Sequence, residues 1–247
     1  MISVFRKIRQ KLLSKNKLTQ YALYAIGEIA LVMLGILLAL QVNDWNEQKK
    51  ERSREANLLR ELQVNLETNV ANLEKDIFVQ ERGLYYINRM VEIIDQKSPY
   101  TDSVPIFLTQ GSYVPDVILT SSAFETLKSS GLELIESDIL RREIIELFEV
   151  TYPYLMQETR RLEDQLWPAV VIPLMQKHFR TVNAQYIPVD YPALLNDQEF
   201  LNMWTFRGAL RASSTLKKRE TAQETRRVIE RIEATLGEIP ITKGLEQ

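Results

Sequence analysis

An acidic side chain stands inside the most apolar stretch of the chain. Glu28 lies within Tyr21–Val42, which reads YALYAIGEIALVMLGILLALQV and has Gln41 as its other main polar interruption. A carboxylate in lipid costs at least about 2.5 kcal/mol, so such a residue is protonated, paired or faces a wet cavity. Its chemistry is therefore that of a proton relay, a contact between helices, or an acid that is merely tolerated.

The residues that share a helical face with Glu28 are mostly small. At 3.6 residues per turn this face carries Ala25, Glu28, Val32, Gly35 and Ala39. Gly35-x-x-x-Ala39 is a small-xxx-small pattern, which lets two membrane helices approach closely. We predict that these five residues form a membrane helix-contact face for oligomerisation or for docking another membrane protein. The proton relay and the tolerated acid remain as alternatives.

Other residues capable of chemistry lack the partners that known mechanisms need. The chain has no cysteine and one histidine, His178, and the residue three before it is Met175 rather than the glutamate of a di-iron bundle. Ser214-x-x-Lys217 matches a serine–lysine pattern, but it lies in a polar helix without the accompanying motifs. We therefore predict no catalytic residue, no cofactor, no metal ligand and no enzymatic activity.

The apolar stretch has the length and the flanks of a transmembrane helix. Its 22 residues span about 33 Å, which exceeds a hydrocarbon core of about 30 Å. Tyr21 and Tyr24 at one end and Trp45 just past the other are predicted interface anchors, because amphipathic rings prefer the headgroup level. A cleaved signal peptide is the alternative. It fits less well because the stretch is long, contains an acid and lacks a good small-residue cleavage site.

Charge predicts the orientation and excludes one class of partner. The first 27 residues carry six cations and no acid, while the whole chain has a net charge of −2, which leaves −8 for the rest. The positive-inside rule keeps the N-terminus in the cytoplasm and places the body across the membrane. An acidic domain lacks the basic surface that neutralises nucleic-acid phosphates, so we predict no nucleic-acid partner. The predicted partners are membrane lipid and either a second copy or another membrane protein.

A long helix is predicted to follow the membrane segment. Residues 43–97 contain no proline and one glycine. Apolar residues there follow a 4-3 spacing, which predicts a seam for another helix, within the domain or across a dimer. The seam residues are Leu66, Val70, Leu73, Ile77, Leu84, Ile87, Val91 and Ile94.

Further helices are predicted between two proline-containing connectors, residues 98–117 and 181–195. Ser122-x-x-Glu125 is a capping box that opens a short helix closed by Gly131. Ser137 begins a long helix that the Trp167-Pro168 pair ends, and a short apolar helix follows.

A last long helix is capped by Asn196 or Asp197 and extends to Leu236. The fold class is all-α, with an N-terminal transmembrane helix continuing into a stalk and an antiparallel extracytoplasmic helical bundle. The predicted parts are a basic cytoplasmic tail at 1–18, a transmembrane helix at 19–42, a polar stalk at 43–57 and the bundle at 58–240.

Two stretches resemble an uncharacterised family of single-pass bacterial inner-membrane proteins. The first is an N-terminal signature, YAIGEI at residues 24–29 followed by GIL at 35–37, ALQ at 39–41, Asn43 and WNE at 45–47. The second is AFETLKSSGL at residues 123–132. The resemblance implies a Gram-negative inner membrane, a cytoplasmic N-terminus and a periplasmic C-terminal domain. It implies no activity, substrate or catalytic residue.

Three functions fit these observations. The first is a membrane-anchored helical interaction or scaffold module of the bacterial cell envelope, which self-associates or docks a larger complex. The second is a periplasmic ligand-sensing domain that signals through a partner, because a bundle joined to a membrane helix can transmit a movement. The third is an accessory subunit of a proton-driven membrane complex that uses Glu28.

Overall fold

A computed structural model describes residues 18–238, without the side chains of residues 18–21, 23 and 159–163. The chain divides into two compact units, Met1–Arg54 and Glu55–Gln247. It is 83% helical and 4% strand, which confirms the all-α class. The predicted basic tail up to residue 17, the side chain of Tyr21 and the last two residues of the predicted bundle lie outside the described residues.

The first unit contains the start of the long helix α2 (Leu18–Asp95). Its side chains from Ile26 to Val42 are exposed although nearly all are apolar. Among the described residues, this is the one helix long and apolar enough to cross a membrane, and none of its apolar window is buried. A signal sequence near an N-terminus also passes this test of length and composition.

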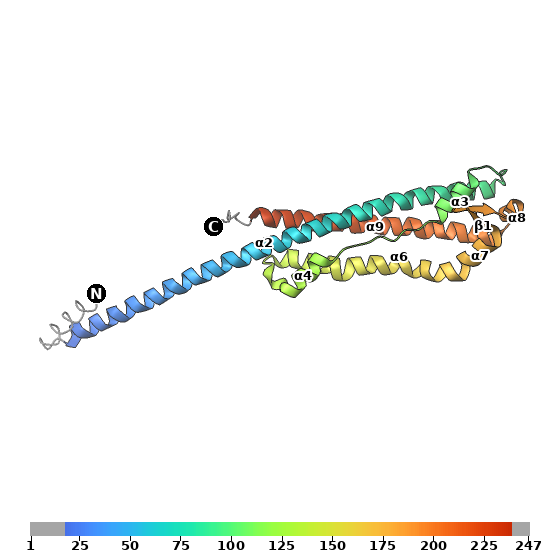
Figure 1. The fold of residues 1–247 in the computed structure, drawn as a ribbon. Coiled ribbons are helices and arrows are strands. Elements are labelled where there is room, and N and C mark those ends of the chain that lie inside the picture. The colour runs from blue at the N-terminus through green and yellow to red at the C-terminus, as the bar shows by residue number, and fades with distance from the viewer. Residues whose placement is uncertain (1–17, 239–247) are drawn as a thin grey trace. The chain divides into compact units, whose positions relative to one another are not determined.

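The second unit is a helical bundle with one small hairpin (Figure 1). Beside α2 it contains α3 (Val104–Ser112), α4 (Ser122–Ser130), η1 (Leu132–Leu134), α5 (Asp138–Glu146), η2 (Leu147–Thr151), α6 (Tyr152–Leu166), η3 (Trp167–Val171), α7 (Ile172–His178), β1 (Phe179–Val182), β2 (Gln185–Pro188), α8 (Tyr191–Leu195) and α9 (Gln198–Glu238).

The last helix, α9, runs antiparallel to its neighbours. Against α2, the Trp204 indole donates to the Ile87 carbonyl at 3.1 Å, whereas near the other end Gln63 donates to Glu233 at 3.1 Å. Against α6, the Tyr152 and Thr225 hydroxyls lie 3.1 Å apart. The extended segment 113–121 returns the chain between α3 and α4, so that α2 and α5–α6 run in the same direction (Figure 1).

Asparagines of α2 hold this extended segment in place. Asn69, which is fully buried, donates to the Thr120 carbonyl at 2.9 Å and accepts from the Thr120 N–H at 2.7 Å. Asn72 donates to the carbonyl of Ile118 at 2.9 Å. A segment without secondary structure thus finds partners for its backbone polar groups in side chains, as buried backbone requires.

The predicted seam of α2 packs inside its own unit. Leu66 lies in a core cluster with residues of α4, α5 and α9, Leu73 in a second, and Ile87 and Ile94 in a third. These four side chains are buried, and the others (Val70, Ile77, Leu84 and Val91) are half-buried. The seam therefore joins helices of one chain, which was the first of its two predicted uses.

Three predicted helix ends are confirmed and one predicted capping box is wrong. The Ser137 side chain accepts from the Leu140 N–H, and Asp197 Oδ1 accepts from the Phe200 N–H at 2.9 Å, so both begin helices. Gly131 ends α4 with a φ of 105°, which favours glycine. The capping box at Ser122 is absent, because the helix begins one residue earlier than its hydroxyl requires. The Ala123 N–H in the first turn donates instead to Asn65 Oδ1 of α2 at 3.2 Å.

Three predicted connections differ from the structure. Trp167-Pro168 does not break the long helix, because a π-helical turn, η3, absorbs the proline and leads into α7. The second connector, which Pro188 and Pro192 led us to expect to be irregular, contains the hairpin β1–β2 and then α8. The hairpin turn places Asn183 and Ala184 at φ values of 49° and 60°. The first connector likewise contains α3.

Candidate functional site

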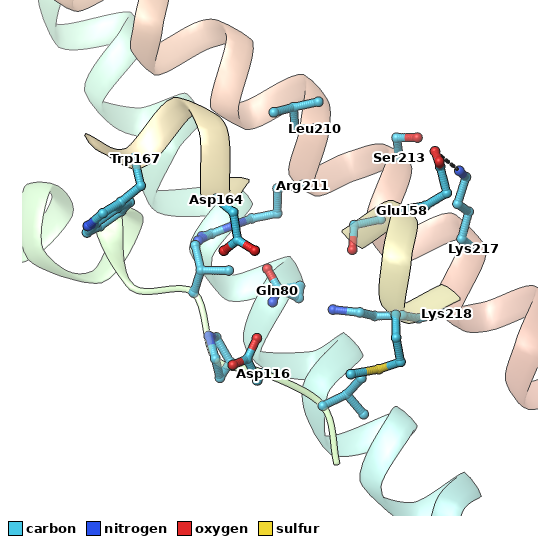
Figure 2. A pocket seen from close by; sticks show the side chains of 15 residues that line it. Gln80, Asp116, Glu158, Asp164, Trp167, Leu210, Arg211, Ser213, Lys217 and Lys218 are labelled. Atoms are coloured by element: carbon cyan, nitrogen blue, oxygen red, sulfur yellow. Dashed lines mark hydrogen bonds and ion pairs between the residues drawn. The ribbon is translucent and has the colours of Figure 1, made fainter. Parts of the chain in front are cut away.

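A cavity of about 270 Å³ lies inside the second unit, where four segments meet. Its walls come from α2, the extended segment, the region from α6 to η3, and α9 (Figure 2). The lining residues are Gln80, Val114, Pro115, Asp116, Val117, Met156, Glu158, Asp164, Trp167, Leu210, Arg211, Ser213, Ser214, Lys217 and Lys218. Most of them are polar or charged, which distinguishes the cavity from a packing defect of the apolar core.

The face of α9 that packs against α2 changes along the helix from apolar to charged and back to apolar residues. Around Trp204 and again around Ala222 this face is apolar and buried, as expected from the spacing. Between them it buries Arg207, Arg211 and Lys218 instead. Charged side chains rarely become fully buried unless they are paired, so this stretch of α9 must meet polar groups on the segments around it.

Arg211 is held between the extended segment and α2. Its Nη2 donates to the carbonyl of Tyr113 in the extended segment at 2.5 Å, and the residue is 4% exposed. The guanidinium fills the space beside Gly83, where a Cβ would lie 2.6 Å from Cζ. Glycine at position 83 therefore makes room for an arginine that ties α9 to the extended segment.

Lys218 and Asp76 form a buried ion pair next to the cavity. Their side chains are 4% and 5% exposed, and Nζ lies 2.5 Å from Oδ2. Removing both charges from water costs several kcal/mol, and the close pairing offsets much of that cost. Figure 2 shows Lys218 pointing toward Gln80 across the open space, so it joins the buried pair to the cavity.

The acidic side chains of the lining come from segments other than α9. Glu158 and Asp164 come from α6, and Asp116 comes from the extended segment. Glu158 accepts from Lys217 Nζ at 3.2 Å. Partial burial opposes the charge on Lys217, but the hydrogen bond and the charge of Glu158 outweigh it and raise the pKa of Lys217. Lys217 of α9 and Glu158 of α6 thus form a pair at one edge of the cavity, while Asp164 and Lys218 lie on different sides of Gln80 (Figure 2).

Arg207 closes one side of this region. Its guanidinium lies over the Trp167 ring, 5.1 Å from the centroid, and its Nη2 donates to the Ser112 carbonyl at 3.2 Å. Stacking of a guanidinium on an indole is favourable, more so where water is excluded. Trp167 itself lines the cavity, so the π-helical turn positions an aromatic wall.

A second polar cluster lies at the start of α9. His178, which is buried, lies with its Nε2 2.8 Å from Asp197 Oδ2, and Lys177 donates to the same oxygen at 2.5 Å. The hydrogen bond from Lys177, followed by that from the Phe200 N–H, holds the pKa of Asp197 well below its ordinary value. Among the described residues, no group of three or more His, Cys, Asp or Glu side chains could hold a metal ion.

The predicted residues of the membrane segment lie in the first unit. Of the helix-contact face, Ala25 is half-buried, while Glu28, Val32, Gly35 and Ala39 are exposed. A Cβ at Gly35 would meet nothing within 4 Å, and the same holds for Gly27 on another face. Among the interface anchors, Tyr24 is half-buried and Trp45 is exposed, with Lys49 Nζ 5.9 Å from its ring centroid.

Sequence reasoning missed the cavity. Arg211 and Lys218 lie in a polar stretch of α9 that resembles a solvated face, and their partners lie far away in the chain. Two signals were present: a lone glycine inside a long helix, Gly83, and a break in the apolar spacing of α9 between Trp204 and Ala222.

The sequence matches a family of unknown function, DUF6090, over residues 28–207. No curated protein matches the chain. No solved structure matches it either.

Proposed function

We propose that this chain, which belongs to the DUF6090 family of unknown function, is a membrane-anchored helical interaction module of the bacterial cell envelope. In this proposal α2 crosses the inner membrane once, with the N-terminus in the cytoplasm and the bundle in the periplasm. The helix-contact face around Glu28 binds a second copy or another membrane protein.

One observation carries the proposal, the exposed apolar surface of α2. Every side chain from Ile26 to Val42 is exposed, and this run includes large residues such as Leu31 and Leu34. A contiguous apolar surface of this size is unstable in water and marks a contact with lipid or protein. The six cations before it favour a cytoplasmic N-terminus.

The contact face adds a reason for association. A carboxyl group in hydrocarbon is stabilised by a partner, and Glu28 is exposed within its own chain. Gly35 and Ala39 continue the same face with little side-chain bulk, so a second helix can approach closely there. The seam from Leu66 to Ile94 is used inside the bundle and takes no part in the proposal.

Cross-linking of the full chain in native membranes tests the proposal. We expect a discrete oligomer or a stable complex with one other membrane protein, and we expect Gly35→Leu to abolish it. Gly27→Leu is the matched control, because it adds the same bulk to the same helix on a different face, also into open space. A monomer in native membranes, or equal losses in both variants, contradicts the proposal.

The cavity favours a second candidate function, ligand sensing by the periplasmic bundle. Small-molecule sites are concave and contain a few convergent polar groups, and this cavity has both properties. Because α2 contributes Gln80 to the cavity and also carries the apolar segment, a ligand there contacts the anchoring helix itself. A ligand-dependent change in the cross-linking pattern supports this candidate, and an unchanged pattern with a bound ligand contradicts it.

A further inference from the structure

We propose that the cavity of the second unit binds a small zwitterion of the amino-acid class, with its carboxylate toward α9 and its ammonium group toward α6 and the extended segment. This inference deepens the ligand-sensing candidate and is independent of how the membrane helices associate.

The distribution of charge in the cavity supports a ligand with two opposite charges. The cations Arg211, Lys217 and Lys218 all come from α9, whereas Glu158 and Asp164 come from α6 and Asp116 from the extended segment. Figure 2 shows Asp164 and Lys218 pointing into the open space around Gln80 from opposite sides. A ligand between them therefore meets the Asp164 carboxylate at one end and, at the other, the Lys218 ammonium group, which also contacts Asp76.

Other ligand classes fit this lining less well. An apolar molecule would displace water from these charged groups without replacing its hydrogen bonds, which is costly. A simple anion would face the carboxylates of Asp116, Glu158 and Asp164, and a simple cation would face the groups of α9. A zwitterion satisfies both walls at once, and its net charge of zero adds no unbalanced charge to the site.

The volume of the cavity and its uncharged polar groups further restrict the class of ligand. About 270 Å³ is just below the usual volume of small-molecule sites, about 300–1,000 Å³, which favours a ligand smaller than a nucleotide or an oligosaccharide. The Gln80 amide and the hydroxyls of Ser213 and Ser214 add donors and acceptors between the charged walls. Met156, Val117 and Trp167 provide apolar surface for a short side chain.

The positions of the lining groups are fixed before any ligand binds. Arg211 is held by the Tyr113 carbonyl and by its contact with Gly83, and Lys218 is held by Asp76. A preorganised site avoids the cost of ordering long cationic side chains when the ligand binds. The part of the cavity that binds the ligand's carboxylate is therefore more rigidly positioned than the part that binds its ammonium group.

Thermal unfolding of the full chain in detergent tests this inference, with the free standard amino acids as probes at millimolar concentration. Each probe is compared with its N-acetyl amide, which keeps the side chain and removes both charges. We expect at least one amino acid to raise the unfolding temperature in a concentration-dependent way. Its blocked analogue should have no effect.

Two variants locate the effect in the cavity. Ser213→Trp fills the space from an exposed lining position, whereas Ala212→Trp adds the same ring at an exposed neighbour that does not line the cavity. Asp164→Asn removes one acid of the lining, and Glu220→Gln removes an exposed acid elsewhere. We expect the first of each pair to weaken binding by about tenfold or more and the second to leave it unchanged.

The inference is overturned if no free amino acid shifts the unfolding temperature, if the blocked analogue acts equally, or if Ser213→Trp retains the shift. A broader metabolite panel in the same assay separates this result from the sensing candidate. A shift from a molecule that is not a zwitterion, abolished by Ser213→Trp, refutes the ligand class and supports ligand sensing.

Discussion

The Arg211 guanidinium occupies the place where a side chain at Gly83 would begin. A Cβ at position 83 would lie 2.6 Å from Arg211 Cζ, and the same guanidinium donates to the Tyr113 carbonyl at 2.5 Å. One glycine of α2 thus allows an arginine of α9 to reach the extended segment behind it. The contact joins three segments that lie far apart in the sequence.

Gly83→Ala should therefore destabilise the bundle. Helix propensity alone predicts a gain of up to about 1 kcal/mol, because alanine is the better helix former. We expect a loss of about 1–3 kcal/mol instead, since the new methyl group displaces a buried arginine from its hydrogen bond. Gly237→Ala, where a Cβ meets nothing within 4 Å, is the control and should be neutral or slightly stabilising. Urea unfolding measures both, and a stabilised Gly83→Ala variant contradicts the account.

The buried pair of Lys218 and Asp76 should behave as a unit. Lys218→Met leaves a buried carboxylate without its cation, which typically costs about 3–5 kcal/mol. The double variant Asp76→Leu and Lys218→Met should recover much of this loss, because no uncompensated charge remains. A double-mutant cycle by urea unfolding measures the coupling. Additive losses in the cycle show that the two side chains do not interact in solution.

Asp197 should make stability depend on pH in the acid range. Its hydrogen bonds from Lys177 and the Phe200 N–H lower its pKa below the ordinary value of 3.8. A carboxyl group with a lowered pKa contributes stability above that ordinary value and loses it as pH falls through the lowered value. Asp197→Asn keeps the helix cap and removes the charge, so its deficit should be largest near neutral pH and should shrink below about pH 4.

The control for this prediction is Asp190→Asn. Asp190 caps α8 through the Ala193 N–H, a bond that asparagine preserves. Unfolding by urea at several pH values compares the two variants with the natural sequence. A deficit of Asp197→Asn that grows as the pH falls contradicts the assignment.

Much of the fold was predictable because its signals are local. The spacing of Leu66, Leu73 and Ile87 predicted a buried helical face, and Ser137 and Asp197 predicted the helix starts. The hairpin was missed because its strands have four residues each with only Phe179 buried, and Pro188 ends one of them. The π-helical turn at Trp167 was missed because proline normally ends a helix, and an extra backbone residue in the turn cannot be read from spacing.

The candidate site was less predictable because it is assembled from distant segments. Gln80, Asp116, Glu158 and Arg211 each look like ordinary surface residues of a polar stretch. They meet because α9 runs back along both α2 and α6, a relationship that periodicity within one helix does not contain. The helix-contact face around Glu28, by contrast, follows from residue spacing within one helix, so the sequence alone predicts it.

Glu28 should act through hydrogen bonding rather than charge. In hydrocarbon a carboxylate is costly, whereas a protonated acid and an amide both donate and accept. We therefore expect Glu28→Gln to keep the cross-linked oligomer and Glu28→Leu to reduce it. If both variants form the oligomer as efficiently as the natural sequence, Glu28 takes no part in the contact. If Glu28→Gln keeps the assembly but abolishes a proton-dependent activity of the isolated complex, the proton-driven alternative gains support.

The central claim is a single crossing of the membrane by α2 with the bundle outside the cytoplasm. Fusions of the full chain to two C-terminal reporters test it, one active only in the periplasm and one fluorescent only in the cytoplasm. We expect activity from the periplasmic reporter, no cytoplasmic fluorescence, and a product of full length that stays in the membrane fraction. Cytoplasmic fluorescence, or a shortened product released from the membrane, contradicts the claim.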